Sequence, residues 1–195
     1  MTWLESITLS SSRVRLELLD HRHESDLIEA VKDGELWRLW YTTIPAPDKM
    51  AAEIDRRLRL HAAGSMLPFA VIDVAAGKAV GMTTFMNADA VNKRVEIGAT
   101  WYRRSVQRTD LNTQCKLMLL THAFEDQGAL RVQFTTDGRN LRAQQAIEGL
   151  GAVKEGVLRK HRTTHDGSVR DSVIYSILDD EWPAVKERLA ARLKR

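Results

Sequence analysis

Cysteine is almost absent from this chain, which has a single one, Cys115, among 195 residues. One thiol cannot build an internal disulfide framework or the cysteine cluster of a structural metal site. The six histidines show neither a His-x-Glu nor a His-Glu-x-x-His spacing, so we expect no metal. Because Cys115 falls on the apolar face of a predicted helix, we interpret it as a core residue rather than a nucleophile.

Long apolar stretches are also missing. No run approaches the roughly 20 apolar residues that a membrane-spanning helix needs. The first residues, Met-Thr-Trp-Leu-Glu-Ser, do not form a basic segment followed by an apolar one, as a secretory signal would. We therefore expect a cytoplasmic protein with no membrane partner.

An excess of charge of one sign is lacking too. The formal net charge is +3, with 28% charged and 44% hydrophobic residues, which is ordinary for a globular domain. A mild positive charge suits an anionic ligand but is too weak for a dedicated nucleic-acid surface, so no nucleic-acid partner is expected. The length suits one well-filled core, and no repeat or linker is visible. We expect one domain, residues 1–195.

The hydrophobic pattern predicts a mixture of strands and helices. Predicted strands cover 11–19, 69–73, 79–85, 95–102, 130–136, 153–161 and 168–178, with a polar connection at 87–93 and a hairpin signal at Asp166-Gly167. Two predicted helices cover 111–124 and 141–150, and three more are assigned caps at Ser25, at Asp48 and at Asp179 or Asp180.

The helix 111–124 has a particular place in this order, because it connects strand 95–102 to strand 130–136. Such a crossover favours parallel pairing of those two strands beside an otherwise antiparallel sheet. The fold class is therefore α+β.

A basic turn joins the strand that ends near Tyr102 to the helix that begins near Leu111. It carries Arg103, Arg104 and Arg108. The free N–H groups and the positive dipole end of the helix point toward such a turn, so a phosphate or pyrophosphate would suit it. A solvated basic turn without a ligand is the alternative.

Four short motifs on these elements carry a resemblance to a known family. They are Val95-Glu-Ile-Gly98, Leu111-Asn-Thr-Gln-Cys-Lys116, Thr136-Asp-Gly-Arg-Asn140 with Arg142, and Ala146-Ile-Glu-Gly-Leu-Gly-Ala152. In this order they resemble the GNAT (Gcn5-related N-acetyltransferase) superfamily, most closely the branch with the ribosomal-protein N-terminal acetyltransferases. The resemblance runs from about Leu9 to Trp182. It implies the GNAT fold, a central mixed and mostly antiparallel sheet flanked by helices, and acetyl-CoA as co-substrate.

The phosphate loop departs from the family pattern Gln/Arg-x-x-Gly-x-Gly/Ala. At the six matching positions this chain reads Ser105-Val-Gln-Arg-Thr-Asp110, with Arg108 and Asp110 in place of both glycines. Glycine allows the backbone to approach a pyrophosphate closely. Arg108 adds a charged donor, and we expect Asp110 to turn outward as the cap of its helix. The resemblance implies phosphate binding by Arg103, Arg104, Gln107, Arg108, Thr109, Leu111, Asn112 and Thr113.

The pantetheine arm of the cofactor is assigned to two further segments by the same resemblance. Asn140 matches the residue that hydrogen-bonds the arm, although it could equally be a plain helix cap. Ala99, Thr100 and Trp101 match the strand end that pairs with the pantetheine amides like an added strand.

Glu96 is the candidate general base. It lies between Val95 and Ile97 on the central strand, and in the family this position often faces the cleft. A structural carboxylate paired with arginine or lysine is the alternative. The positions of the family's usual acid hold Ile147 and Ala143, which cannot donate a proton. The thiolate must then be protonated by solvent or by another group, and the tyrosines on core strands are Tyr102 and Tyr175.

The acceptor wall is assigned to Trp37, Trp40 and Tyr41, between the first two helices, with a core role for one tryptophan as the alternative. His122 is interpreted as a structural histidine.

The leading hypothesis is an N-acetyltransferase in which a protein N-terminus or a small amine attacks acetyl-CoA directly. A non-catalytic acyl-CoA-binding or sensing domain is the alternative, and a nucleic-acid-binding module is a remote third. We also expect a homodimer, as is frequent in this branch.

Overall fold

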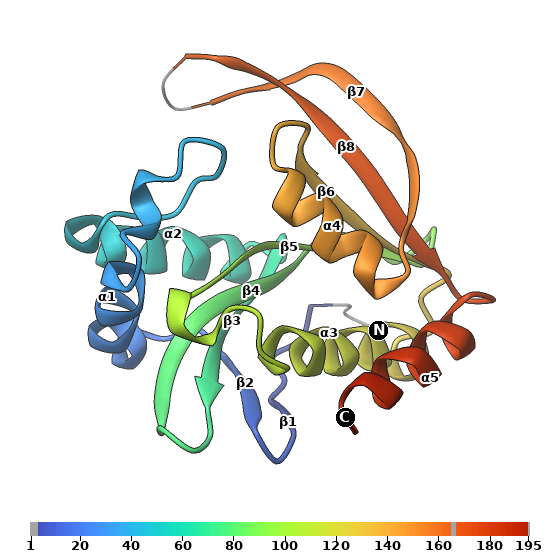
Figure 1. Ribbon diagram of the computed structural model, residues 1–195, viewed down its shortest axis with the longest axis horizontal. Helices are drawn as coiled ribbons and strands as arrows, with labels where there is room; N and C mark the ends of the chain where they lie inside the picture. The colour runs from blue at the N-terminus through green and yellow to red at the C-terminus, as the bar shows by residue number, and fades with distance from the viewer. Residues whose placement is uncertain (1–3, 165–166, 195) are drawn as a thin grey trace.

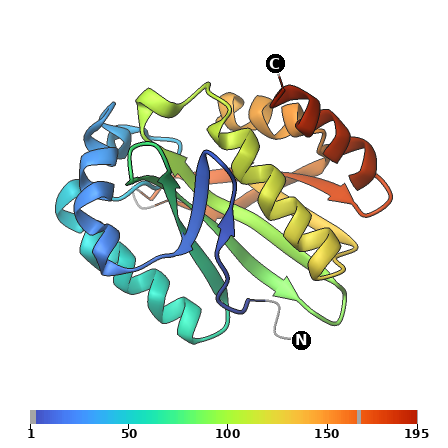
Figure 2. The same cartoon turned by 90° about the horizontal axis from the view of Figure 1, so that it is seen from below.

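The computed structural model describes residues 4–164 and 167–194 of the chain. Its centre is an eight-stranded sheet in the order β1-β2-β3-β4-β5-β6-β8-β7. Helices α1 and α2 lie at one side of the molecule and α3, α4 and α5 at the other (Figures 1 and 2). No helix within these residues is long and apolar enough to cross a membrane.

The strands agree with the predicted α+β class. They are β1 Leu9–Ser10, β2 Val14–Leu18, β3 Met66–Asp73, β4 Lys78–Asp89, β5 Arg94–Tyr102, β6 Arg131–Asp137, β7 Val153–Thr163 and β8 Val169–Leu178. The predicted parallel pair is confirmed, because β5 pairs with β6 in parallel while the other neighbours pair antiparallel. Strand β4 continues to Asp89, so the polar connection predicted at 87–93 is shorter than expected.

The helices lie where the periodicity placed them. They are α1 Glu24–Lys32, α2 Met50–Ala62, α3 Leu111–Thr121, α4 Leu141–Leu150 and α5 Trp182–Arg192. Helix α3 passes directly into a π-helical turn at His122–Asp126, so the apolar pattern predicted to 124 spans two kinds of helix.

Three predicted helix caps are wrong. Ser25 lies inside α1, because a 3₁₀ turn at His21–His23 comes first and Asp20 accepts a hydrogen bond from the Arg22 N–H. Asp48 lies inside the 3₁₀ turn Pro47–Lys49 that leads into α2.

The cap of α5 is Glu181 instead of Asp179 or Asp180. Pro183 has no N–H and is tolerated only in a first helical turn, which places the start of this helix immediately before it. In the predicted Asp166-Gly167 turn, Asp166 lies outside the described residues, while Gly167 has φ +79°.

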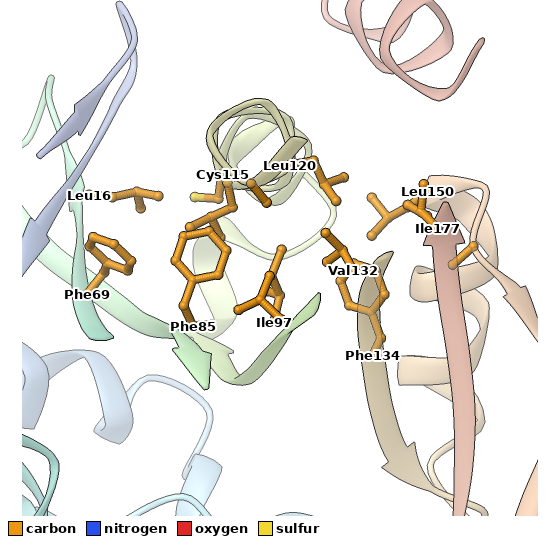
Figure 3. Close-up of a cluster of buried hydrophobic side chains, with 14 of the residues drawn as sticks. Leu16, Phe69, Phe85, Ile97, Cys115, Leu120, Val132, Phe134, Leu150 and Ile177 are labelled. Carbon is orange, nitrogen blue, oxygen red and sulfur yellow. The ribbon is translucent and has the colours of Figure 1, made fainter. Parts of the chain in front are cut away.

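Two hydrophobic clusters form the core, one on each face of the sheet. One joins the sheet to α3, α4 and α5, and the other joins it to α1 and α2. Cys115 points into the first cluster, among Leu16, Phe85 and Leu120 (Figure 3). Burial raises the pKa of its thiol to about 12, so it stays a neutral thiol at pH 7, and its interpretation as a core residue is confirmed.

Gly81 allows β4 and β5 to approach each other closely. A Cβ at this position would lie 2.2 Å from the Trp101 carbonyl oxygen and 2.9 Å from the Tyr102 Cα, both of them backbone atoms that cannot easily move. We expect Gly81→Ala to lower the free energy of unfolding by about 1–3 kcal/mol, as overpacked sites do. Urea denaturation measures this change. Gly156→Ala is the matched control because nothing lies within 4 Å of its added Cβ, and equal losses in both variants would contradict the prediction.

Candidate acetyl-CoA cleft

Strands β5 and β6 pair over a short distance and then diverge. Their register joins Arg94 to Arg131, Val95 to Val132 and Glu96 to Gln133, and within the described residues it ends there. From Ile97 onward, the edge of β5 that faces β6 has no paired strand. Unpaired strand edges are templates for an extended ligand with amide groups, which is the chemistry of a pantetheine arm.

A β-bulge shapes this open edge. Thr84 pairs with Gly98 and Met82 pairs with Trp101, so Ala99 and Thr100 together face a single residue of β4. Ala99 has φ +48°, in the left-handed region. Such a bulge bends the strand and increases its twist. It therefore helps to turn β5 away from β6.

Arg57 of α2 stabilises the bulge by hydrogen bonds. It is buried, and its Nη1 donates to Thr84 Oγ1 at 2.9 Å while Nη2 donates to the Ala99 carbonyl at 3.4 Å. Its Nε donates to Glu53 at 2.7 Å, which supplies the counter-charge. Arg57 was not predicted from the sequence, although this residue continues the buried helical spacing of Met50 and Ile54 and places a charge on that apolar face.

The start of α3 offers free backbone donors beside this edge. The N–H groups of Asn112 and Thr113 have no acceptor within the described residues, whereas Leu111 N–H donates to Thr109 Oγ1 at 3.3 Å. Arg108 has φ +65°, so it adopts the backbone conformation that glycine favours. The loop therefore retains a glycine-like shape at this position without the glycine.

The three arginines of the turn have different partners. Arg103 Nε donates to Asp33 at 2.9 Å, and its Nη1 lies 3.7 Å from Glu29, so this side chain ties the turn to α1. The backbone N–H of Arg104 donates to the Asp33 carbonyl oxygen at 3.2 Å. Neither the Arg104 nor the Arg108 guanidinium has an ion pair among residues 4–164 and 167–194. Both are exposed, so they remain available to phosphate.

Asp33 and Gln107 hold the turn in place. Hydrogen bonds from Ser105 and Arg103 hold the pKa of the Asp33 carboxyl below its usual range, although burial opposes this. Gln107 Nε2 donates to the Tyr102 carbonyl at 2.6 Å, so this side chain is engaged within the turn. Asp110 takes the cap position of α3, but its exposed carboxylate lies 3.7 Å from Arg13 Nη1 and makes no capping hydrogen bond within the described chain.

Asn140 lies across the gap, at the start of α4. Its Oδ1 accepts the Ala143 N–H at 3.0 Å, which makes it the helix cap. The Nδ2 amide makes no hydrogen bond to a described residue and can still donate to a ligand. The two roles weighed for Asn140 are therefore compatible.

Glu96 lies at the point where the strands separate. It is 6% exposed, and its Oε2 accepts from Asn87 Nδ2 at 2.9 Å and from Gln133 Nε2 at 3.4 Å. No arginine or lysine of the described chain pairs with it, in contrast to the structural alternative considered above. A Cβ at Gly98 would lie 3.5 Å from Glu96 Oε1, so this glycine leaves space beside the carboxylate.

The predicted acceptor residues divide into two groups. Trp37 packs against the cluster beneath α1 and α2, while Trp40 is 59% exposed and stacks edge-on against Tyr41 at 5.5 Å. The Arg139 guanidinium lies 4.8 Å from the Trp40 ring centroid. This contact links the aromatic loop to the turn that carries Asn140.

Comparison with known proteins identifies the family of this architecture. The model of the acetyltransferase (GNAT) domain matches residues 13–153, well over half of the chain. The chain belongs to the GNAT acetyltransferase family. The resemblance read from the sequence is thus confirmed, and acetyl-CoA is the acetyl donor of this family.

Individual relatives agree with this assignment. YdaF of Bacillus subtilis (strain 168), described as a candidate ribosomal N-acetyltransferase, is 31% identical over 110 residues, which are 56% of this chain and 59% of that protein. The match therefore spans less than two thirds of YdaF. A solved acetyltransferase-like structure from T. thermophilus is 35% identical with a TM-score of 0.86, over 98% of this chain and 99% of its own. A GCN5-related N-acetyltransferase from Brucella melitensis is 28% identical with a TM-score of 0.85, over 96% of this chain and 85% of its own.

The two tyrosines on the core strands of this GNAT domain, Tyr102 and Tyr175, are poor proton donors. The Tyr102 hydroxyl is enclosed beside the Cys115 thiol without a hydrogen bond of normal geometry, and burial raises its pKa well above the usual value. Burial and Glu148 raise the pKa of Tyr175 to about 12, and its hydroxyl donates to Glu148 at 3.0 Å. Both side chains belong to the core cluster beneath α3 and α4.

His122 and the possible metal ligands are the last features of the site. His122 is buried and its Nδ1 lies 2.8 Å from Asp126 Oδ2, so the structural role expected for it is confirmed. No group of three or more His, Cys, Asp or Glu side chains that could hold a metal ion occurs in the part of the chain that the structure describes.

Arg108 provides a test of the phosphate turn. If its guanidinium binds a CoA phosphate, Arg108→Ala should weaken CoA binding by about 1–3 kcal/mol, the scale of a charged hydrogen bond. The loss should shrink at high salt because the side chain is exposed. Titration calorimetry measures both effects.

Arg108→Gly is the matched control because it removes the same guanidinium but suits the positive φ. We expect it to lose a similar amount of CoA affinity while unfolding no more readily than the wild type. CoA affinity that is unchanged in both variants would remove Arg108 from the site.

Proposed function

We propose that this GNAT domain transfers the acetyl group of acetyl-CoA to the α-amino group of a protein N-terminus by direct attack of the amine. The observation that carries the proposal is the divergence of β5 from β6, with the open start of α3 at one end and the Glu96 carboxylate at the other. This arrangement suits a ligand with a charged end, an amide-bearing arm and a reactive tip.

The cofactor would lie along this gap. Its phosphates would meet Arg104, Arg108, Thr109 and the N–H groups of Asn112 and Thr113, with Arg103, Gln107 and Leu111 shaping the turn. The pantetheine amides would pair with the β5 edge at Ala99, Thr100 and Trp101, where Trp101 contributes backbone only because its ring is buried. Asn140 would donate its free amide from the other side of the gap.

Glu96 would accept the proton of the attacking amine, directly or through a water molecule. The neutral amides of Asn87 and Gln133 orient its carboxylate without placing an opposite charge beside it, as a general base requires. Backbone N–H groups of β5 would polarise the thioester carbonyl. The thioester C–S bond then breaks as the amide C–N bond forms.

Two features support a protein N-terminus as the acceptor. The relative YdaF is described as a candidate ribosomal N-acetyltransferase. The exposed ring of Trp40 with Tyr41 offers faces that suit a cationic or peptide amine, and a hollow of about 430 Å³ beside Arg139 offers room for the residues that follow. A small amine remains the alternative acceptor.

Three further expectations belong to this proposal. Ribosomal acceptors imply a cytoplasmic location. The apolar side chains of Val153 and Leu158, exposed on β7, support a two-fold homodimer through this strand. The two core clusters share one sheet, which supports a single domain over residues 1–195.

The acceptor is tested with a panel of amines. With peptides that carry the free N-termini of ribosomal proteins, the enzyme should release CoA thiol from acetyl-CoA. With the same peptides blocked at the N-terminus and carrying a lysine, it should not. Polyamines serve as the small-amine arm of the panel. Faster thiol release with polyamines or lysine would overturn the N-terminal acceptor. Acetyl-CoA binding without thiol release from any amine would favour the sensing alternative.

The role of Glu96 is tested by Glu96→Gln, which keeps the shape of the side chain and removes its basicity. Turnover should fall about 10²-fold, the low end of general-base contributions, while CoA affinity stays close to that of the wild type. Glu187→Gln, at an exposed position on α5, is the control and should leave turnover unchanged. If Glu96→Gln keeps its turnover per folded molecule and only unfolds more readily, Glu96 is a structural carboxylate.

A further inference from the structure

Lys116 of α3 is a buried lysine at the gap between β5 and β6. Lys116 is 6% exposed, and its Nζ donates to Thr100 Oγ1 at 3.1 Å. The same Nζ lies 5.9 Å from the centroid of the Phe134 ring. Thr100 belongs to the bulge of β5 and Phe134 to β6, so the ammonium lies between the two strands that diverge.

No carboxylate in the described part of the chain neutralises this ammonium. Among the described residues it has no ion pair, and the one titratable group that acts on it electrostatically is the Cys115 thiol on its own helix. Tyr102 of β5 lies beside that thiol but is itself neutral at pH 7. Burial lowers the pKa of Lys116 to about 8, so it is mostly protonated at pH 7 and loses its proton above pH 8.

A buried ammonium without a counter-charge is costly, and it is not an arrangement that helps the fold. An ammonium has three donors, and Thr100 accepts one of them. Thr100 Oγ1 is itself 2.8 Å from Thr83 Oγ1 of β4, so the ammonium meets a hydroxyl and not a charge on the β5 side. The remaining donors suit an anionic ligand that enters the gap.

The leaving thiolate of CoA is such a ligand. We propose that Lys116 is the proton donor for the sulfur of CoA when the thioester breaks. The C–S electron pair goes to sulfur, the Lys116 Nζ–H proton moves to that sulfur, and neutral CoA thiol and a neutral lysine result. The amine proton goes to the base on the other side, and Lys116 regains a proton from water after CoA leaves. This inference rests on the proposed acetyl transfer.

The proton affinities of the two partners are well matched. A thiol has an ordinary pKa of about 8.5, and a donor of similar pKa transfers a proton to it with little driving-force penalty. Tyr102 and Tyr175 are poorly suited to this role, because burial raises their pKa values and their side chains belong to the core. Lys116 provides the acid that the sequence left unassigned.

The thiol of bound CoA gives a direct test that needs no acceptor. In the wild type, the bound thiol and the Lys116 ammonium should titrate as a coupled pair, so that the thiolate absorbance in the ultraviolet appears at an apparent pKa below that of free CoA during a pH titration. Lys116→Met, which keeps the volume and removes the charge, should abolish this shift while CoA still binds. Lys78→Met is the control, since Lys78 is exposed and pairs with Glu29, and it should titrate like the wild type.

The result that overturns the proposal is a bound thiol whose pKa equals that of free CoA in the wild type, or one that stays lowered in Lys116→Met. The wild-type titration decides the matter even if the variant does not fold. Acetylation of Lys116 itself, seen in the intact mass after incubation with acetyl-CoA, would make it an acceptor and also overturn the proposal.

Kinetics then separate this inference from the proposed function. Lys116→Met should lower kcat about 10²-fold with little change in KM for acetyl-CoA, and it should lose the fall in rate that the wild type shows above about pH 8. Failure of every amine to react, with the thiol shift still present, would contradict the acceptor proposal and leave Lys116 supported. A normal kcat in Lys116→Met with a productive amine would contradict Lys116 alone.

Discussion

The early end of the β5–β6 pairing is the constraint on which the rest of this molecule depends. Parallel strands normally continue side by side, and stopping after Glu96 and Gln133 leaves backbone donors and acceptors without partners. Residues near the separation point stabilise the unpaired edge of β5. The bulge at Ala99 turns β5 away, and Arg57 satisfies the carbonyl that the bulge exposes. A half-open sheet therefore persists inside an otherwise ordinary mixed α/β core.

The charges around the gap are arranged in two ways. At the turn before α3, the carboxylates of Glu29 and Asp33 engage Arg103, so that part of the basic cluster positions the loop. Deeper in the gap, no carboxylate among the residues that the structure describes pairs with Lys116. An arginine cluster read as one site thus contains both scaffolding and free charge, and only the contacts of each side chain distinguish them.

The sequence predicted most of the fold, because strand alternation and helical stripes repeat over many residues. The parallel crossover through α3 followed from element order alone. The caps at Asn140 and Asp110 were predicted, whereas those at Ser25 and Asp48 were wrong, since both residues have the right chemistry but 3₁₀ turns moved the true helix starts. Around the site, Arg57 and Lys116 were missed, because their importance depends on burial between elements distant in the sequence. The motif that contains Glu96 indicated it as the candidate base. Its hydrogen bonds to the amides of Asn87 and Gln133 could be found only in the three-dimensional structure.

The contact between Arg139 and Trp40 has a thermodynamic consequence. It connects the aromatic loop after α1 with the turn that ends in Asn140, and a cation–π contact of this kind contributes about 0.5–1 kcal/mol. Any molecule that displaces Trp40 must break it, so the conformational equilibria of the two loops are linked. Linkage of this sort is reciprocal: whatever one occupant does to the affinity for the other, the second does equally to the first. If the acceptor binds at Trp40 and the cofactor at Asn140, as proposed, binding of one substrate therefore changes the affinity for the other.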